Sequence, residues 1–264
     1  MLSYWDFGGD GPPVVLLHGL AGHCGEWERT ARWLTPLYRV VAPDARGHGA
    51  SDRRPSDVSP NAHVADVVQL MELLGIAPVV LVGQSLGGVT ALLAAARYPR
   101  LVRALVLVEA SPAGEPEHAD AAASEFRTAL SSWPVPFASR QGAHDFFRSR
   151  FGTPSAADAW TSGLEERADG WWPRFDIDVM VETLRQASQH SYWNEWENLT
   201  CPILLVRAAG GIVDLETVDR MKVSAPQTQT AELEGARHDV HLDRPHDWQE
   251  LLSHFLEDDL RDAG

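Results

Sequence analysis

The chain has 264 residues, of which 44% are hydrophobic, and its formal net charge at pH 7 is −15. That apolar content suffices for one large core, or for a core that carries a smaller insertion. A chain this acidic repels phosphate backbones and anionic lipids, so nucleic acid and membrane surfaces are not expected among its partners.

Short apolar runs alternate with helical patterns in the first part of the chain. Strands are predicted at residues 3–7, 14–17, 38–42, 79–82 and 101–108. Helices are predicted at residues 26–34 and 61–74, and an Ala-rich helix begins after Gly87. The runs are continuous rather than alternating, which is typical of strands in a sheet that is covered on both faces.

Residues 112–198 interrupt this alternation. They contain no long apolar strand, and prolines divide them into several short predicted helices. Many tryptophans lie here, and we expect most of them to hold a small helical subdomain together. One or two rings, with Trp133 and Trp193 as candidates, are expected to line an apolar substrate pocket beneath a helical lid.

The alternation resumes after residue 198, with predicted strands at 202–207 and 230–233 and helices at 213–223 and 248–255. This pattern predicts an α/β fold with a mostly parallel, twisted sheet of about seven strands and helices on both faces. The core domain is predicted to comprise residues 1–111 and 199–264, and the lid residues 112–198.

The most informative stretch is Gly83-Gln84-Ser85-Leu86-Gly87, which lies between a predicted strand and a predicted helix. A serine at such a turn stands in a strained backbone conformation and needs small residues two positions before and after it. Gly83 and Gly87 meet that need. The hydroxyl then lies at a helix N-terminus, which favours a developing anion, and this predicts a nucleophile.

A serine nucleophile needs a base within hydrogen-bond reach and an acid that orients the base. In an open α/β sheet, both groups come from loops at the carboxyl ends of strands. His238 is the expected base, with His241 as its rival. The acid is Glu109, because a carboxylate at the end of a buried strand is unfavourable unless it is paired, or else Asp214, which also fits a helix N-cap.

Two backbone N–H groups are needed to stabilise the oxyanion, and those of Leu20 and Leu86 are the candidates. His18 is expected to brace the loop of Leu20 through side-chain hydrogen bonds, and Cys24 either lines the pocket mouth or fills apolar space. The candidate pocket residues are His18, Cys24, Gln84, Trp133 and Trp193. The spacing of His238 and His241 is not that of a zinc site, so neither a metal nor a cofactor is expected.

These motifs together resemble the α/β-hydrolase fold superfamily over nearly the whole chain. The resemblance is carried by residues 18–22, 44–51, 83–88 and 235–245. It implies that Ser85 is the nucleophile, that His238 is the base, that Leu20 and Leu86 supply the oxyanion hole, and that the loop of Asp44 is structural. It also implies a lid after the sixth family strand.

Two departures from the family pattern are visible. Many members place the acid in a turn after the seventh strand, but residues 207–212 contain no carboxylate. Some members use an acid after the sixth strand instead, and Glu109 occupies that position. The first family strand is also missing, which agrees with about seven strands in place of eight.

The predicted function is a cofactor-free serine hydrolase that cleaves a small, largely apolar carboxylic ester, lactone or thioester. A carbon–carbon bond hydrolase or lyase on the same triad is an alternative, and so is a catalytically silent ligand-binding member of the fold. Two cysteines, no visible signal peptide and no membrane span suggest a cytoplasmic protein. We expect a monomer or a homodimer.

Overall fold

A seven-stranded sheet forms the centre of the molecule in the computed structural model, which describes residues 2–259. The strand order is β1-β3-β2-β4-β5-β8-β9, and β1 pairs antiparallel with β3 while the other neighbours pair in parallel. Its strands are β1 (Tyr4–Gly8), β2 (Pro13–Leu17), β3 (Arg39–Pro43), β4 (Val79–Gln84), β5 (Val102–Val108), β8 (Ile203–Ala208) and β9 (Thr228–Leu233). The predicted α/β fold is confirmed.

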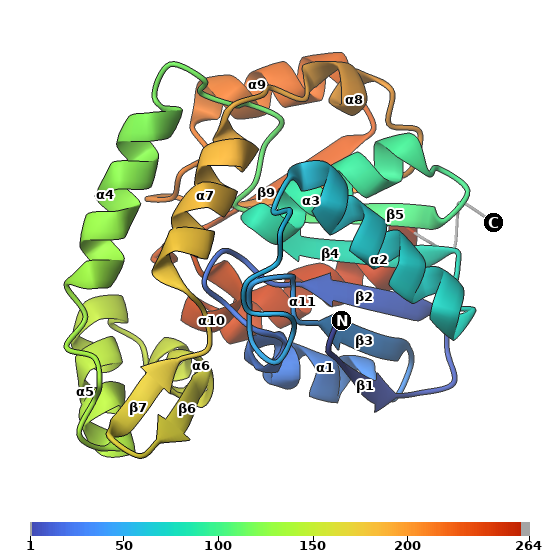
Figure 1. The fold of residues 1–264 in the computed structure, drawn as a ribbon. Helices are drawn as coiled ribbons and strands as arrows, with labels where there is room; N and C mark the ends of the chain where they lie inside the picture. The colour runs from blue at the N-terminus through green and yellow to red at the C-terminus, as the bar shows by residue number, and fades with distance from the viewer. Residues whose placement is uncertain (1, 260–264) are drawn as a thin grey trace.

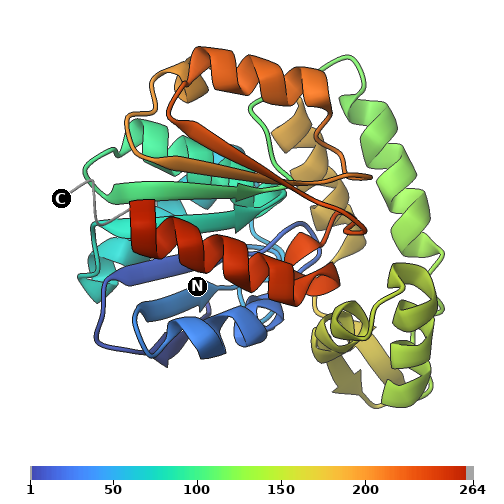
Figure 2. The same ribbon diagram turned by 180° about the vertical axis from the view of Figure 1, so that it is seen from behind.

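Helices cover both faces of this sheet (Figures 1 and 2). They are η1 (Cys24–Trp27), α1 (Glu28–Leu34), α2 (Pro60–Leu74), α3 (Leu86–Arg97), α8 (Trp193–Glu197), α9 (Leu215–Ser224), α10 (Val240–Asp243), α11 (Pro245–His254) and the π-helical turn η2 (Phe255–Asp259). Within residues 2–259, no helix is both long enough and apolar enough to cross a membrane.

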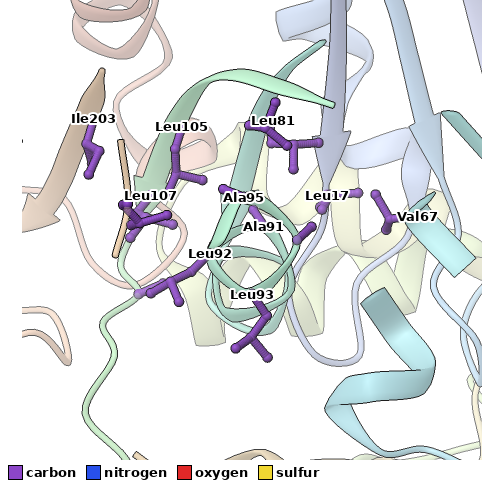
Figure 3. Close-up of a cluster of buried hydrophobic side chains, with 14 of the residues drawn as sticks. Leu17, Val67, Leu81, Ala91, Leu92, Leu93, Ala95, Leu105, Leu107 and Ile203 are labelled. Atoms are coloured by element: carbon purple, nitrogen blue, oxygen red, sulfur yellow. The ribbon is translucent and has the colours of Figure 1, made fainter. Parts of the chain in front are cut away.

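The alternation of side chains along each strand builds two cores, one on each face. On β2, Val15 and Leu17 point to the face that α2 and α3 cover, whereas Val14 and Leu16 point to the face of α1 and α11. Figure 3 shows the first core, in which Ala91 of α3 lies among side chains of the neighbouring strands. Small residues on this helix let it approach the sheet closely.

Local signals set the ends of the helices, as α2 illustrates. The hydroxyl of Ser59 accepts a hydrogen bond from the backbone amide of Ala62, and Pro60 occupies the first helical position. The helix ends at Gly75, whose φ of 61° is left-handed and therefore suits glycine. Cap residues thus define an element that the apolar spacing alone places only approximately.

Residues 119–188, which we call the insertion, lie between β5 and β8 in the chain and to one side of the sheet (Figure 1). The insertion comprises α4 (Ala119–Ser131), α5 (Arg140–Phe151), α6 (Pro154–Ser162), β6 (Leu164–Arg167), β7 (Gly170–Pro173) and α7 (Ile177–Ser188). Most of the members of its hydrophobic cluster come from the insertion itself, with Leu20 and Ala21 added from the core.

The antiparallel hairpin of β6 and β7 lies among the short helices predicted for this region and was not itself predicted. Its strands are four residues long, and β6 carries two glutamates and an arginine, so no apolar run marks it in the sequence. The helix α8 follows the insertion and packs on the core instead. There Trp196 is fully buried and its indole nitrogen donates to the carbonyl of Met221 at 3.0 Å.

Candidate active site

Ser85 stands at the turn between β4 and α3 with φ 50° and ψ −115°, a strained conformation for a residue with a side chain. Its amide donates to the carbonyl of Val108 at 2.9 Å. A Cβ added at Gly83 would lie 2.3 Å from the carbonyl oxygen of Gly87, and one added at Gly87 would lie 2.4 Å from that of Leu17. No side chain fits at either position, as the turn pattern predicts.

Glu109 follows β5 directly, and its carboxylate is fully buried. Oxygen Oε2 lies 3.5 Å from Nδ1 of His238. The two carboxylate oxygens also accept hydrogen bonds from the amides of Ala208 at 2.7 Å and Ile212 at 2.6 Å. A Cβ at Gly211 would lie 2.0 Å from Oε2. The turn after β8 has no carboxylate of its own and is shaped around the one from β5.

The rival acid and the rival base have other partners. The carboxylate of Asp214 accepts a hydrogen bond from the amide of Thr217 at 2.6 Å, which makes it the N-cap of α9. The ring of His241 stacks on Trp27 with centroids 4.0 Å apart, and its Nε2 lies 3.5 Å from a carboxylate oxygen of Glu26. The structure therefore brings Glu109, not Asp214, to His238.

Three carboxylates act on the charge of His238. Burial disfavours the charged ring, but Glu109, Asp239 and Glu26 outweigh this effect and raise the pKa of His238 above its ordinary value. Because Nδ1 faces Glu109, Nε2 is the nitrogen left to exchange a proton. A buried carboxylate in this position both orients the imidazole and favours its charged form.

The two candidate oxyanion donors lie in different elements. Leu86 is the first residue of α3, so its amide has no acceptor within the helix. Leu20 precedes Ala21, whose amide donates to Nε2 of His48 at 3.0 Å. His48 is fully buried, and burial, assisted by the nearby His18, lowers the pKa of His48 well below its ordinary value, so Nε2 stays free to accept this bond. No separate role of His48 was visible in the sequence.

His18 braces the same loop. Its Nδ1 donates to the carbonyl of Gly19 at 2.7 Å, and its Nε2 accepts from the amide of Ala45 at 2.9 Å. The loop of Asp44 is also structural, because its carboxylate accepts from the amides of Cys24 at 2.7 Å and Ala50 at 2.9 Å. These contacts hold the chain on both sides of Leu20.

A cavity of about 690 Å³ lies between the sheet and the insertion. Its wall contains Ser85, Glu109, His238, Leu20, Leu86, Gln84 and Trp133 among the predicted site residues, together with the exposed Asp214. The structure does not place His18, Cys24 or Trp193 there, which corrects the prediction for these three.

The contacts of His18, Cys24 and Trp193 explain why these residues lie outside the cavity wall. His18 is turned toward the loop that it braces, and Cys24 is buried in the core behind the sheet, where burial raises the pKa of its thiol. Trp193 lies in α8, and the guanidinium of Arg220 sits 3.7 Å from its ring centroid. Among residues 2–259, no group of three or more His, Cys, Asp or Glu side chains is arranged to hold a metal ion.

A family model for the alpha/beta hydrolase fold matches residues 12–245. The chain belongs to the alpha/beta hydrolase fold family. It is 29% identical over 263 residues to the sn-1-specific diacylglycerol lipase ABHD11 of Mus musculus, a match that covers 97% of this chain and 85% of the lipase. It is 26% identical to 2-(acetamidomethylene)succinate hydrolase of Mesorhizobium japonicum, over 94% of this chain and 89% of that enzyme.

Solved structures agree with this family. The crystal structure of E-2-(acetamidomethylene)succinate hydrolase superposes with a TM-score of 0.88 at 24% identity and covers 97% of this chain and 95% of its own. A marine microorganism esterase superposes with a TM-score of 0.80 at 20% identity, over 96% of this chain and 98% of its own. At these identities the structural likeness establishes the fold.

One side chain near His238 of this alpha/beta hydrolase, that of Asp239, was missed in the sequence, and a second, that of Gln84, makes a contact that was not predicted. Asp239 follows His238 directly, and its carboxylate accepts a hydrogen bond from the indole nitrogen of Trp160 at 3.2 Å. Gln84 was predicted to line the pocket, but its amide also donates to the carbonyl of His238 at 3.0 Å. The position of Asp239 next to His238 was visible in the sequence, whereas its partner Trp160, 79 residues away, could not be seen there.

Proposed function

We propose that this chain is a serine hydrolase that cleaves a small, largely apolar carboxylic ester, lactone or thioester. The observation that carries the proposal is the buried carboxylate of Glu109, 3.5 Å from Nδ1 of His238, in the wall of the same cavity as Ser85. A glycine-lined turn that holds a strained serine at a helix N-terminus supports the same conclusion.

The reaction proceeds through an acyl-enzyme. Nε2 of His238 takes the proton of Ser85 as the hydroxyl oxygen attacks the carbonyl carbon, and the amides of Leu20 and Leu86 stabilise the oxyanion. His238 then gives the proton to the departing alcohol or thiol. A water molecule, deprotonated by His238, attacks the acyl-enzyme and releases the carboxylic acid, and the proton returns to Ser85.

The insertion serves as a lid over this site. Side chains of the insertion in the cavity wall include Phe126, Leu130, Trp133, Phe151 and Trp160, and a volume of about 690 Å³ suits a small molecule. An apolar cover excludes water and strengthens the electrostatic interactions beneath it. The two named relatives act on different substrates, which supports hydrolysis as the shared chemistry and leaves the specificity to this cover.

A fluorophosphonate probe and a panel of p-nitrophenyl esters test the proposal. We expect the probe to label wild type and to leave Ser85→Ala unlabelled. Ser111 also lines the cavity, so Ser111→Ala is the control and should still be labelled. Ester hydrolysis by Ser85→Ala should fall by at least about 10³-fold. Equal rates in Ser85→Ala and wild type would refute the proposal. Labelling with cleavage of 1,3-diketones but not esters would indicate carbon–carbon hydrolysis instead.

A further inference from the structure

The loop that carries His238 holds a second carboxylate, that of Asp239, which hydrogen-bonds in two directions. Trp160 of α6 donates its indole N–H to Oδ2 at 3.2 Å. The side-chain amide of Gln84, next to the nucleophile, lies 3.5 Å from Oδ1 and also donates to the carbonyl of His238. Asp239 therefore connects the insertion with the turn that bears Ser85.

The insertion holds the indole of Trp160 in place. The ring stacks on Phe151 with centroids 4.9 Å apart and planes 10° apart, and it meets Trp133 edge-on at 5.7 Å. All three rings lie in the cavity wall. A substrate that fills the cavity consequently contacts the aromatic group that fixes the direction of the indole N–H.

Two further contacts join the same loop to the same part of the insertion. The hydroxyl of Thr153 donates to Asp243 at 3.3 Å, and the guanidinium of Arg237 donates to the carbonyl of Arg150 at 3.4 Å. The amide of Arg237 in turn donates to Asp243 at 2.8 Å. The insertion thus holds the loop on both sides of Asp239, and the position of this carboxylate depends on the position of the insertion.

We propose that Asp239 is a positioning residue for His238 and that Trp160 couples it to the insertion, so that closure over the cavity aligns the base. This inference rests on the proposed function. Asp239 follows His238 directly and its charge favours the protonated ring, so it stabilises the imidazolium that forms when Ser85 loses its proton. The hydrogen bond from the indole of Trp160 fixes the position of the Asp239 carboxylate.

Other charged and titratable groups also act on the imidazole of His238. Glu109 reaches it from the end of β5 and Glu26 from η1, and both raise the pKa of His238 together with Asp239. Burial raises the pKa of Glu26 itself to about 7, so its charge is lost as pH falls below that value. His241, from α10, is neutral near pH 7 because burial lowers the pKa of its ring to about 4. Removing the charge of Asp239 should therefore move the titration of His238 to lower pH without abolishing the pair with Glu109.

Two substitutions and their combination test the proposal. Asp239→Asn keeps the shape and removes the charge, while Trp160→Phe keeps an aromatic ring and removes the N–H. The matched control is Trp172→Phe, since Trp172 lies in the same insertion and donates its indole N–H to Asp169 at 2.9 Å. NMR titration of His238 and steady-state ester hydrolysis against pH are measured for each.

We expect the midpoint of His238 and the acidic limb of kcat/KM to move to lower pH in both variants, and kcat to fall by about 10-fold with a smaller change in KM. In the Asp239→Asn background, Trp160→Phe should have no further effect on kcat. Trp172→Phe should behave as wild type.

Equal losses of kcat from Trp160→Phe in both backgrounds, or a rise in KM alone, would show that the ring is only part of the wall and would overturn the proposal. An unmoved His238 midpoint in Asp239→Asn would do the same. Because NMR titration needs no substrate, these outcomes are distinct from failure of the proposed function, which is seen as absence of probe labelling in wild type.

Discussion

Gly211 should be sensitive to substitution although it carries no side chain, because its Cα faces the carboxylate of Glu109. In Gly211→Ala the new Cβ would lie 2.0 Å from Oε2 of Glu109, whereas real Cβ contacts are essentially never shorter than 3.0 Å. The carboxylate must therefore move by about 1 Å, and a displacement of that size in a catalytic site lowers the rate by about 10²-fold.

The same displacement affects folding. The amide of Ile212 donates to the moved oxygen at 2.6 Å, and a hydrogen bond to a charged group contributes about 2 kcal/mol. Losing it in a domain of this size lowers Tm by roughly 4–8 °C. Gly210→Ala is the matched control, because a Cβ at Gly210 meets nothing within 4 Å. It should keep both the wild-type kcat and the wild-type Tm.

We measure kcat with a short p-nitrophenyl ester. Circular dichroism on the same samples checks that each variant is folded, and thermal melting gives its Tm. A folded Gly211→Ala enzyme with wild-type kcat would refute the assignment of Glu109 as the acid, since its carboxylate could not then be aligned with His238. Equal losses in Gly210→Ala and Gly211→Ala would instead attribute the effect to the backbone of the turn.

Two further predictions concern groups outside the triad. Asp214→Asn should leave kcat unchanged and alter Tm little, and a hundredfold fall in its kcat would contradict this. Asp214→Ala should lower the free energy of unfolding by about 1 kcal/mol, because α9 loses its N-cap. Burial and the cation of Arg46 lower the pKa of His63 from 6.5 to about 3, so only the unfolded chain takes up this proton between those values. Stability should fall as pH falls across that window, and His63→Gln should weaken the dependence of Tm on pH; an unchanged dependence would contradict the argument.

The features that could be predicted from the sequence are those that depend on residues close together in the chain. The turn around Ser85 needs glycines at fixed positions, and continuous apolar runs indicate a covered parallel sheet, so both are visible in short stretches. Pocket membership is not local, because it depends on how a helix is rotated in the folded chain. Trp133 and Trp193 look equivalent in the sequence, yet one faces the cavity and the other packs under Arg220.

The position of Glu109 follows from the pairing of two neighbouring strands. Val108 is paired with Val206, so Glu109 leaves β5 beside the last residues of β8, which ends at Ala208 just before the turn. Glu109 has φ 50°, the same left-handed value as Ser85, and its buried carboxylate lies against the turn after β8. An acid on either strand can therefore reach the same point beside His238, provided that the other strand contributes amide donors and a residue without a side chain. Gly211 and Ile212 fulfil that condition here, which explains how the turn after β8 can lack an acid without leaving the histidine unpaired.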